Sequence, residues 1–290
     1  MQIKIGKFKC GSRAGTFPPF LLASIFYDGQ NMVHDQQNGI FDRDKALAQI
    51  RLAEESSQRF QIPVAMDVLA STPLAMRRYL EFVSEYSELP FVIDSSVQEP
   101  RLEGLKFCSE NNLLDRAIYN SIGEDSLDEE LQALAEYQAA AVILMGINQD
   151  DYSPAGTIQL LEELLPSLCR RKIKNLMVDV CVLDQVSLKS STEIAKAVKE
   201  KFSLPVGGAP CNGVYMWETL KTLPPALFET GLASTIAYAT SRGFDFAFSG
   251  PVKSIGKSAV AVSVSAVYDG YALRQENWEL PESHPLNNMF

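Results

Sequence analysis

Short apolar runs recur along the chain, and amphipathic segments separate them. Eight runs are rich in β-branched or other apolar residues: 20–27, 63–70, 90–96, 116–122, 140–148, 175–182, 204–208 and 245–250. Runs of this length, bounded by turn residues, predict buried strands. The intervening segments, among them 44–60, 72–86, 126–138, 156–170 and 191–202, repeat apolar residues at three- and four-residue spacings, which predicts helices.

This alternation predicts the fold class. Strands and helices in turn imply right-handed βαβ crossovers and a parallel sheet, and eight such units are typical of a closed (β/α)8 TIM barrel. We therefore predict an α/β fold, a single TIM-barrel domain over residues 1–290. A doubly wound open sheet is the alternative, but its GxGxxG fingerprint is missing after the first run, which continues into SIFYDGQNMVHDQQNG.

Three segments lie outside the repeating pattern. The long polar loop 28–42 is expected to form a lid or wall over the barrel mouth, or else a plain surface loop. Residues 223–243 predict a further helix before the last strand. The chain from about residue 274 has little periodicity, and we expect it to pack on the barrel or on a neighbouring subunit of a homodimer.

Composition narrows the class of protein. A chain of 290 residues with 46% hydrophobic and 21% charged residues is typical of soluble globular proteins. The formal net charge of −10 disfavours binding to nucleic acid, because neutralising phosphates needs clustered Lys and Arg. The start MQIKIGKFKC alternates Lys with Ile and Phe, so we expect no leader peptide, and no stretch of about 18 uninterrupted apolar residues is present to span a membrane. We therefore expect a cytoplasmic protein.

The cysteines, the histidines and a segment that resembles a phosphate loop provide little evidence of a disulfide, metal or nucleotide site. The five cysteines are widely spaced and odd in number, so neither a disulfide framework nor a zinc site is indicated. His34 and His284 are interpreted as solvated or locally bonded residues, and no metal site is predicted. SGPVKSIGKS is not a Walker A motif, because Gly250 and Gly256 are one residue too far apart. Lys253 and Lys257 could still hold a phosphate or carboxylate, or simply flank a packed turn.

Polar side chains stand where the apolar runs stop, which is where the active site of a TIM barrel lies. They are Asp67, Asp94, Asn120, Asn148 and Asp179, with Asn212 following the glycine turn after the seventh run. A ring of carboxylates and amides suits a flat heterocycle that carries an amino group and ring N–H donors beside a carbonyl, as a pterin does. Singly, each could instead cap a helix. The ring could also bind a hard cation, but the predicted strand ends carry no Lys or His base.

Several strings resemble one protein family. SIFYDGQNMV, PFVIDSS, DRAIYNSI, LMVDV and LPVGGAPCNGVYMW, in this order, resemble the H subunit family of tetrahydromethanopterin S-methyltransferase. The resemblance is strongest to its stand-alone bacterial relatives, which move methyl groups between corrinoid proteins and tetrahydrofolate. It covers most of residues 5–250. More distantly, the ring is similar to that of the pterin-binding barrels, which include methyltetrahydrofolate:corrinoid methyltransferases and dihydropteroate synthases.

The resemblance implies a site. It assigns the pterin to Asp94, Asn120 and Asp179, and it places Asn212 near the pterin N5 as the catalytic residue. The predicted pterin pocket also includes Asp67, Asn148, Gly207 and Ser249. Dihydropteroate synthase activity is not expected, because FSGPVKSIGKS supplies neither the Arg nor the His which that reaction requires.

The resemblance also implies a reaction and partners. It predicts a methyltransferase that moves a methyl group between a methylated corrinoid (cobalamin) protein and N5 of tetrahydrofolate, giving 5-methyltetrahydrofolate. The cobalamin is carried by the partner protein, and the folate is the small-molecule substrate. Three alternatives stay open: a tetrahydromethanopterin-dependent methyltransferase subunit, a metal-dependent barrel lyase or isomerase, and a non-catalytic pterin-binding subunit.

Overall fold

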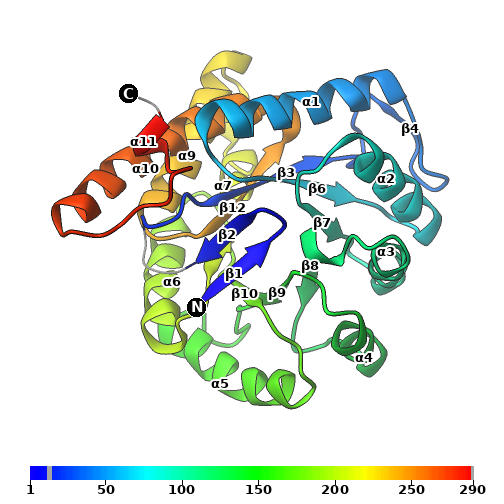
Figure 1. Ribbon diagram of the computed structural model, residues 1–290, viewed down its shortest axis with the longest axis horizontal. Helices are drawn as coiled ribbons and strands as arrows, with labels where there is room; N and C mark the ends of the chain where they lie inside the picture. Colours follow the sequence, from blue (N-terminus) through cyan, green and yellow to red (C-terminus); the bar gives the residue numbers. More distant parts are fainter. Residues whose placement is uncertain (12–14, 289–290) are drawn as a thin grey trace.

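Eight parallel strands close into a barrel in the computed structural model, which describes residues 1–11 and 15–288 (Figure 1). The strands are β3 (Phe20–Ile25), β6 (Val64–Leu69), β7 (Phe91–Asp94), β8 (Ala117–Ile122), β9 (Ala141–Met145), β10 (Leu176–Asp179), β11 (Val206–Gly208) and β12 (Phe246–Pro251). Each strand pairs with the next in this order, and β12 pairs with β3 to close the barrel. Each coincides with one of the predicted runs, so the TIM barrel is confirmed.

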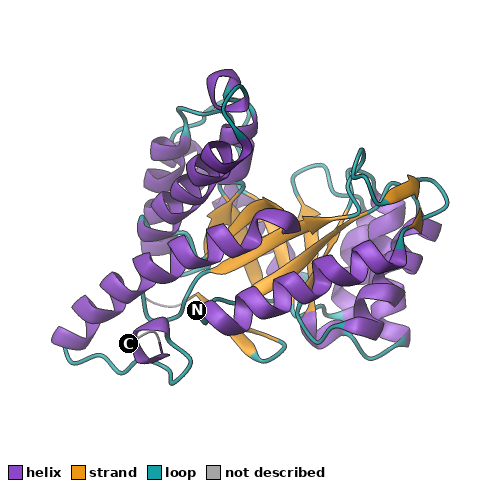
Figure 2. Ribbon diagram, turned by 90° about the horizontal axis from the view of Figure 1, so that it is seen from above, coloured by secondary structure: helices purple, strands orange, loops and turns teal. Residues whose placement is uncertain are grey.

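Helices cover the outside of the barrel (Figure 2). They are α1 (Arg43–Phe60), α2 (Pro73–Tyr86), α3 (Gln98–Glu110), α4 (Asp128–Tyr137), α5 (Pro154–Arg170), α6 (Leu188–Phe202), α7 (Pro210–Tyr215), α8 (Glu218–Lys221), α9 (Pro225–Ser241) and α10 (Ile255–Gln275). Their starts follow ordinary capping chemistry. Thr72 caps α2: its side chain accepts a hydrogen bond from the Ala75 N–H, and Pro73 is the first residue of the helix. Asp42 caps α1 by accepting from the Lys45 N–H.

The barrel strands are buried on both faces. Phe20, Leu21 and Leu22 of β3 are all fully buried, as are Val64, Ala65 and other residues of the strands around the barrel. One face packs inside the barrel and the other against the helices. This explains why the strands appear in the sequence as continuous apolar runs without alternation.

A hairpin that the sequence analysis did not predict crosses the amino-terminal end of the barrel. Strands β1 (Gln2–Ile5) and β2 (Phe8–Gly11) pair antiparallel and bury Ile3, Ile5 and Cys10. The Gly6 N–H donates a hydrogen bond to the Asp115 carbonyl, just before β8. Figure 1 shows the hairpin in front of the barrel strands. It therefore closes the end of the barrel opposite to the strand carboxyl ends.

The polar loop 28–42 forms an ordered hairpin against α2. Its strands are β4 (Val33–Asp35) and β5 (Ile40–Phe41). Thr72 Oγ1 donates to the Gln37 carbonyl at 2.7 Å, and Phe41 lies edge-on to Phe26 and Tyr79. These contacts fix the loop to α2, and the expectation of a lid or wall over the mouth, or else a plain surface loop, stays a prediction.

The carboxyl-terminal segment packs on the last long helix. After α10, the short helix α11 (Pro285–Asn288) lies against it. His284 is fully buried: its Nδ1 accepts from the Leu286 N–H at 3.1 Å, and its Nε2 lies 3.2 Å from the Gly15 carbonyl. Burial lowers the pKa of His284. The interpretation of His284 as locally bonded is therefore confirmed, whereas solvation at this position is wrong.

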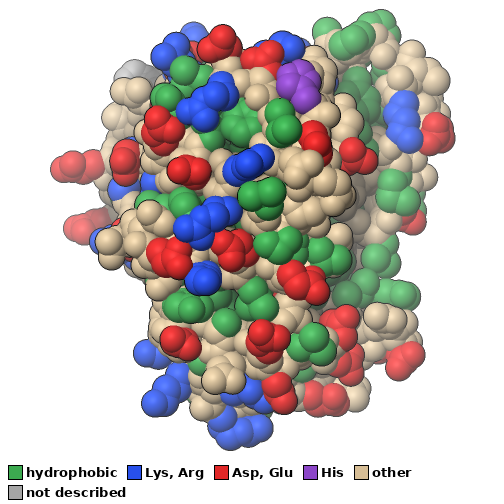
Figure 3. Space-filling view, turned by 90° about the vertical axis from the view of Figure 1, so that its right-hand side faces the viewer, with side chains coloured by type: hydrophobic (Ala, Val, Ile, Leu, Met, Phe, Trp, Pro, Cys, Tyr) green, Lys and Arg blue, Asp and Glu red, His purple; other side chains and the backbone are tan. Residues whose placement is uncertain are grey.

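The surface over α2 and α3 mixes charges of both signs, as the face in Figure 3 shows. Arg77 pairs with Glu103 at 2.8 Å and with Glu110 at 3.1 Å, and Arg43 pairs with Glu85 at 3.4 Å. Exposed pairs of this kind contribute little to stability individually. Across the residues that the structure describes, no helix has the length and apolar character needed to cross a membrane.

We predict that Phe41→Ala destabilises the protein, because Phe41 fastens the β4–β5 hairpin to the Phe26–Tyr79 stack. The free energy of unfolding should fall by about 2 to 4 kcal/mol, the range for truncating a packed aromatic side chain. Tyr79→Phe is the control, since the buried Tyr79 hydroxyl has no hydrogen-bond partner among the described residues. Denaturant titration measures both, and equal stability of Phe41→Ala and wild type would contradict the prediction.

Candidate functional site

The strand register joins three of the predicted residues at the barrel mouth. Asp94 at the end of β7 lies opposite Asn120 on β8, whose side chain favours the ionised form of Asp94. The charge of Asp94 in turn raises the pKa of Asp67, which comes from β6. Asp67, Asp94 and Asn120 thus lie close enough to influence one another across three neighbouring strands.

Two buried carboxyl groups, those of Asp67 and Asp94, lie near one another at the mouth. Asp67 is only 2% exposed, and Ser24 Oγ donates to its Oδ2 at 2.7 Å. Burial, together with the charge of Asp94, raises the pKa of Asp67 well above its ordinary value. Burial also raises the pKa of Asp94, and interactions with Asp67 and Asn120 oppose that rise. Both carboxyl groups are therefore harder to ionise than in water, Asp67 more so than Asp94.

Asp179 supplies a separate carboxylate at the end of β10. Burial raises its pKa to about 6, and the charge of Asp94 adds to this effect. The Cys181 N–H opposes the rise by donating to Asp179 Oδ1 at 2.7 Å. Near neutral pH this buried group is therefore ionised at a free-energy cost, which a ligand with N–H donors would relieve.

The glycine that faces Asp179 is Gly208, one residue beyond the predicted Gly207. A Cβ on Gly208 would lie 3.1 Å from Asp179 Oδ1. A Cβ on Gly207 would come within 2.1 Å of the Phe246 carbonyl oxygen, so Gly207 permits the close approach of β11 and β12. Neighbouring residues of a strand face opposite sides, which accounts for the difference.

Asn148 and Ser249 use their polar groups within the fold. Asn148 Oδ1 accepts from the Asp150 and Asp151 N–H groups at 3.0 and 3.3 Å, and Nδ2 donates to the Gly156 carbonyl. Ser249 Oγ donates to the Leu22 carbonyl at 3.1 Å, where the register of β12 shifts. The Asn148 contacts hold the loop between β9 and α5, and the Ser249 contact lies at the irregular part of β12. Both side chains are therefore already hydrogen-bonded within the fold.

Asn212 lies at the rim of the mouth, on α7. It is exposed, and Cys211 Sγ lies 3.7 Å from its Oδ1. Burial and the neighbouring Asp67 raise the pKa of Cys211 to about 12. The influence of Asp67 on Cys211 places the start of α7 beside the acidic residues, with Asn212 on the solvent side.

Several residues of the mouth were missed by sequence reasoning. Ser24, Cys181 and Cys211 contact or adjoin the acids through hydrogen bonds or charge. Tyr215 of α7 packs against the backbone of Gly250. Ser24 interrupts an apolar run at the level of Asp67 and was the available signal, while the others became visible only through the fold.

Glu229 contacts the segment SGPVKSIGKS at the end of β12, which resembles a phosphate loop in sequence. Glu229 of α9 pairs with Lys257 and accepts from Ser254 Oγ at 3.3 Å. Lys253 is exposed. Of the two alternatives for this loop, the packed turn agrees with these contacts.

No group of three or more His, Cys, Asp or Glu side chains within residues 1–11 and 15–288 is arranged to hold a metal ion. Burial raises the pKa values of Asp67, Asp94 and Asp179, and a ligand with hydrogen-bond donors would favour their ionised forms.

Comparison with known proteins identifies the family of this chain. The family model described as "Tetrahydromethanopterin S-methyltransferase MtrH subunit" matches residues 1–279. The chain belongs to this family. The MtrH-family relatives include the H subunit of the tetrahydromethanopterin S-methyltransferase of Methanothermobacter thermautotrophicus, which is 32% identical over 98% of this chain and 96% of that protein. The H subunit of the putative methyltransferase mtx of Methanosarcina barkeri is 31% identical over the same shares.

Solved structures show the same fold at low identity. A dihydropteroate synthase of Yersinia pestis superposes on this MtrH-family chain with a TM-score of 0.64 at 13% identity, covering 95% of this chain and 100% of that chain. A dihydropteroate synthase of Xanthomonas albilineans gives 0.62 at 15% identity, covering 94% and 98%. This likeness shows that the two proteins share the (β/α)8 barrel fold with this chain.

We predict that Asp179→Asn stabilises the ligand-free MtrH-family chain near neutral pH. The folded-state pKa of about 6 exceeds the ordinary 3.8, so the wild-type carboxyl favours folding below pH 4 and loses this contribution as the pH rises through 6. An amide avoids the cost and still accepts from the Cys181 N–H. At pH 7.5 the free energy of unfolding should rise by up to about 3 kcal/mol.

Urea titrations of both proteins at pH 4 and pH 7.5 measure this difference. The two proteins should be similar at pH 4 and differ at pH 7.5. Glu129→Gln on α4, at an exposed position, is the control for removing a charge. A difference that does not change with pH would contradict the raised pKa.

Proposed function

We propose that this chain transfers a methyl group between a methylated corrinoid protein and N5 of a tetrahydropterin. The supporting observation is the set of polar residues at the barrel mouth, Asp67, Asp94 and Asn120 on neighbouring strands and the buried Asp179 on β10, in a member of the MtrH family. A pterin ring presents an amino group and N–H donors beside a carbonyl. Two carboxylates and one amide at the mouth complement that edge.

The names of the relatives favour tetrahydromethanopterin as the pterin. Two of the relatives, at 31–32% identity, carry tetrahydromethanopterin in their names, and neither name gives tetrahydrofolate. Tetrahydrofolate, predicted from the resemblance to stand-alone bacterial relatives, stays as the second candidate. Both compounds have the same ring edge and the same N5, so the site above serves either.

The reaction implied is a displacement in line with the methyl–cobalt bond. The N5 electron pair forms the new C–N bond, the Co–C bond breaks, and its electron pair stays with the cobalt of the partner. The corrinoid supplies this chemistry, and the barrel supplies position. Asp94, Asn120 and Asp179 hold the ring edge.

The protein also has an electrostatic task. N5 gains positive charge as the bond forms, and the negative charge on Asp94 and Asp179 favours that change. Burial and the charge of Asp94 raise the pKa of Asp67, which favours the neutral form of Asp67. We assign to Asn212, on the open rim, the hydrogen bond to N5.

We predict that Asn120→Ala weakens pterin binding by about 1 to 3 kcal/mol, because it removes a polar partner of a buried ligand group. Asn148→Ala is the matched control: it removes an amide from a neighbouring strand end whose contacts lie within the β9–α5 loop. Isothermal titration with tetrahydromethanopterin and tetrahydrofolate gives both affinities. If Asn148→Ala weakens binding and Asn120→Ala does not, the pocket is placed wrongly.

Methyl transfer itself can be followed in the cobalt absorption spectrum. The purified chain, mixed with a methylated corrinoid protein and either pterin, should demethylate the corrinoid, and the preferred pterin identifies the substrate. Asn212→Ala should lower the rate at least tenfold, since hydrogen-bonding assistance typically contributes about 10²-fold or more, while pterin affinity changes little. Tight pterin binding without turnover would favour a non-catalytic subunit, and loss of activity with a chelator would favour the metal-dependent alternative.

A further inference from the structure

An apolar groove lies at the rim of the mouth, between the loop after β10 and the helices α7 and α9. Its volume is 440 Å³. Val182 and Val186 line it on the side of the loop, and Trp217 and Tyr238 line it on the side of the helices. Figure 2 shows the helices of this region rising past the strand ends, on the side away from the amino terminus. Because the loop and α7 both follow the carboxyl ends of strands, the groove lies at the open end of the barrel.

Both walls of the groove start at the acidic residues of the mouth. The loop follows Asp179 directly, and α7 starts two residues after Gly208, which faces Asp179. The walls also pack closely on each other, because a Cβ on Gly213 of α7 would lie only 2.9 Å from the Asp184 carbonyl oxygen. A protein held in the groove would therefore have a fixed position relative to the mouth.

The loop wall is ordered and yet holds apolar side chains in water. Asp184 Oδ1 accepts from the Val186 and Ser187 N–H groups at 3.0 and 2.8 Å, and Ser187 Oγ accepts from the Leu183 N–H at 3.0 Å. Despite this order, Val186 is 78% exposed, and Leu183 is exposed as well. A loop that is already fixed loses little conformational entropy on binding, so these apolar side chains are prepared for contact with another protein.

The helix wall carries residues that are common at protein interfaces. Trp217 is 44% exposed, and its neighbour Met216 is also exposed. Tryptophan and methionine are enriched in the cores of interfaces, and tryptophan often contributes a large share of the binding energy. The lining holds one acidic and one basic side chain, Asp184 and Lys189, so it has no net charge in a chain whose net charge is −10. The groove therefore suits an uncharged, apolar segment of another protein.

We propose that this groove docks the methylated corrinoid protein, through an apolar segment on the surface of that partner. The inference rests on the proposed function and adds a docking surface to it. The methyl–cobalt bond must come into line with N5, so the partner has to cover the rim beside Asn212. Asn212 belongs to α7, the helix that forms one wall of the groove. A partner seated in the groove therefore lies directly beside the place of methyl transfer.

The size of this surface fits a partner that binds and leaves. Leu183, Val186, Trp217 and Tyr238 together expose roughly 400 Å², about half of one partner's share of a standard protein interface. The rim of the mouth supplies further area beside them. A permanent dimer of two copies of this chain would need about 2,000 Å² or more in total, most of it apolar. The groove therefore favours a transient partner over a second copy.

Val186→Glu tests the groove by placing a charge in its apolar wall. Initial rates are measured with the methylated corrinoid protein that the wild type demethylates fastest, over a range of concentrations of that protein. The KM for the corrinoid protein should rise at least about tenfold, because docking would bury an unpaired carboxylate. With free methylcobalamin as the methyl donor, which needs no docking, the rate should change less than about twofold, as for an ordinary surface substitution.

Trp217→Ala tests the opposite wall by removing a large apolar side chain. It should raise the same KM at least about fivefold and leave the rate with free methylcobalamin unchanged. Tyr268→Glu on α10 is the matched control for Val186→Glu, because Tyr268 is 71% exposed and lies outside the lining of the groove. It adds the same charge and should leave the KM for the corrinoid protein unchanged.

The failure of the docking surface can be told from the failure of the proposed function. If the wild type transfers the methyl group and both groove variants keep its KM for the corrinoid protein, the docking surface is wrong and the proposed function stands. An equal loss of rate with free methylcobalamin would also contradict docking, because the variants would then disturb the site itself. If light scattering shows a wild-type dimer that Val186→Glu converts to a monomer, the groove joins two copies of this chain and the proposal is overturned. If the wild type demethylates neither donor, the proposed function falls, and the docking surface falls with it.

Discussion

The site depends on how much negative charge a nearly dry barrel mouth can hold. Asp67, Asp94 and Asp179 are close enough to influence one another, and burial makes each ionisation expensive. Ser24 donates a hydrogen bond to Asp67, and Asn120 favours the ionised form of Asp94. Asp179 keeps only one fixed donor, the Cys181 N–H. The mouth is therefore prepared for a ligand that brings its own N–H donors.

The barrel makes this arrangement possible because its register is rigid. Parallel pairing sets Asp94 opposite Asn120 and Ser24 opposite Asp67, so the contacts follow from the closure of the sheet. The opposite end is covered by the β1–β2 hairpin, which buries Ile3 and Ile5. The carboxyl ends of the strands are left as the open end, in agreement with the usual position of TIM-barrel sites.

The sequence predicted the strands and the main acids well, because both signals are local. A fully buried strand appears as a continuous apolar run, and Asp94, Asn120 and Asp179 stand out where such runs stop. The side of the sheet to which a strand residue points cannot be read from the local sequence. A shift of one residue reverses the side, so Gly208 faces Asp179 whereas Gly207 faces Phe246. Asn148 looks like a ring member in sequence, and only the path of its loop shows that its amide is already used. The β1–β2 hairpin was missed because its strands have four residues each and pair only with one another.

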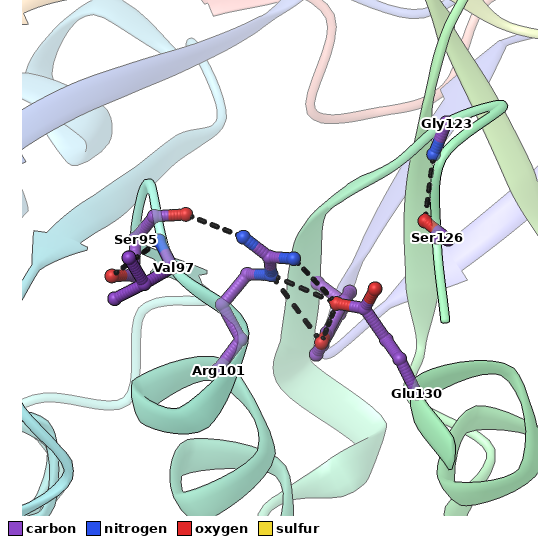
Figure 4. Close-up of polar contacts among 7 residues, drawn as sticks. Ser95, Val97, Arg101, Gly123, Ser126 and Glu130 are labelled. Atoms are coloured by element: carbon purple, nitrogen blue, oxygen red, sulfur yellow. Dashed lines mark hydrogen bonds and ion pairs between the residues drawn. The ribbon is translucent and has the colours of Figure 1, made fainter. Parts of the chain in front are cut away.

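The buried Arg101–Glu130 pair positions the elements behind two of the strand ends (Figure 4). Arg101 Nη2 donates to Glu130 Oε1 at 2.6 Å, and Nη1 donates to the Ser95 carbonyl at 2.7 Å, which ties α3 to α4 and to the loop after β7. A buried ion pair contributes little net stability. Its contribution in this protein is therefore one of position, because Ser95 directly follows Asp94 along the chain.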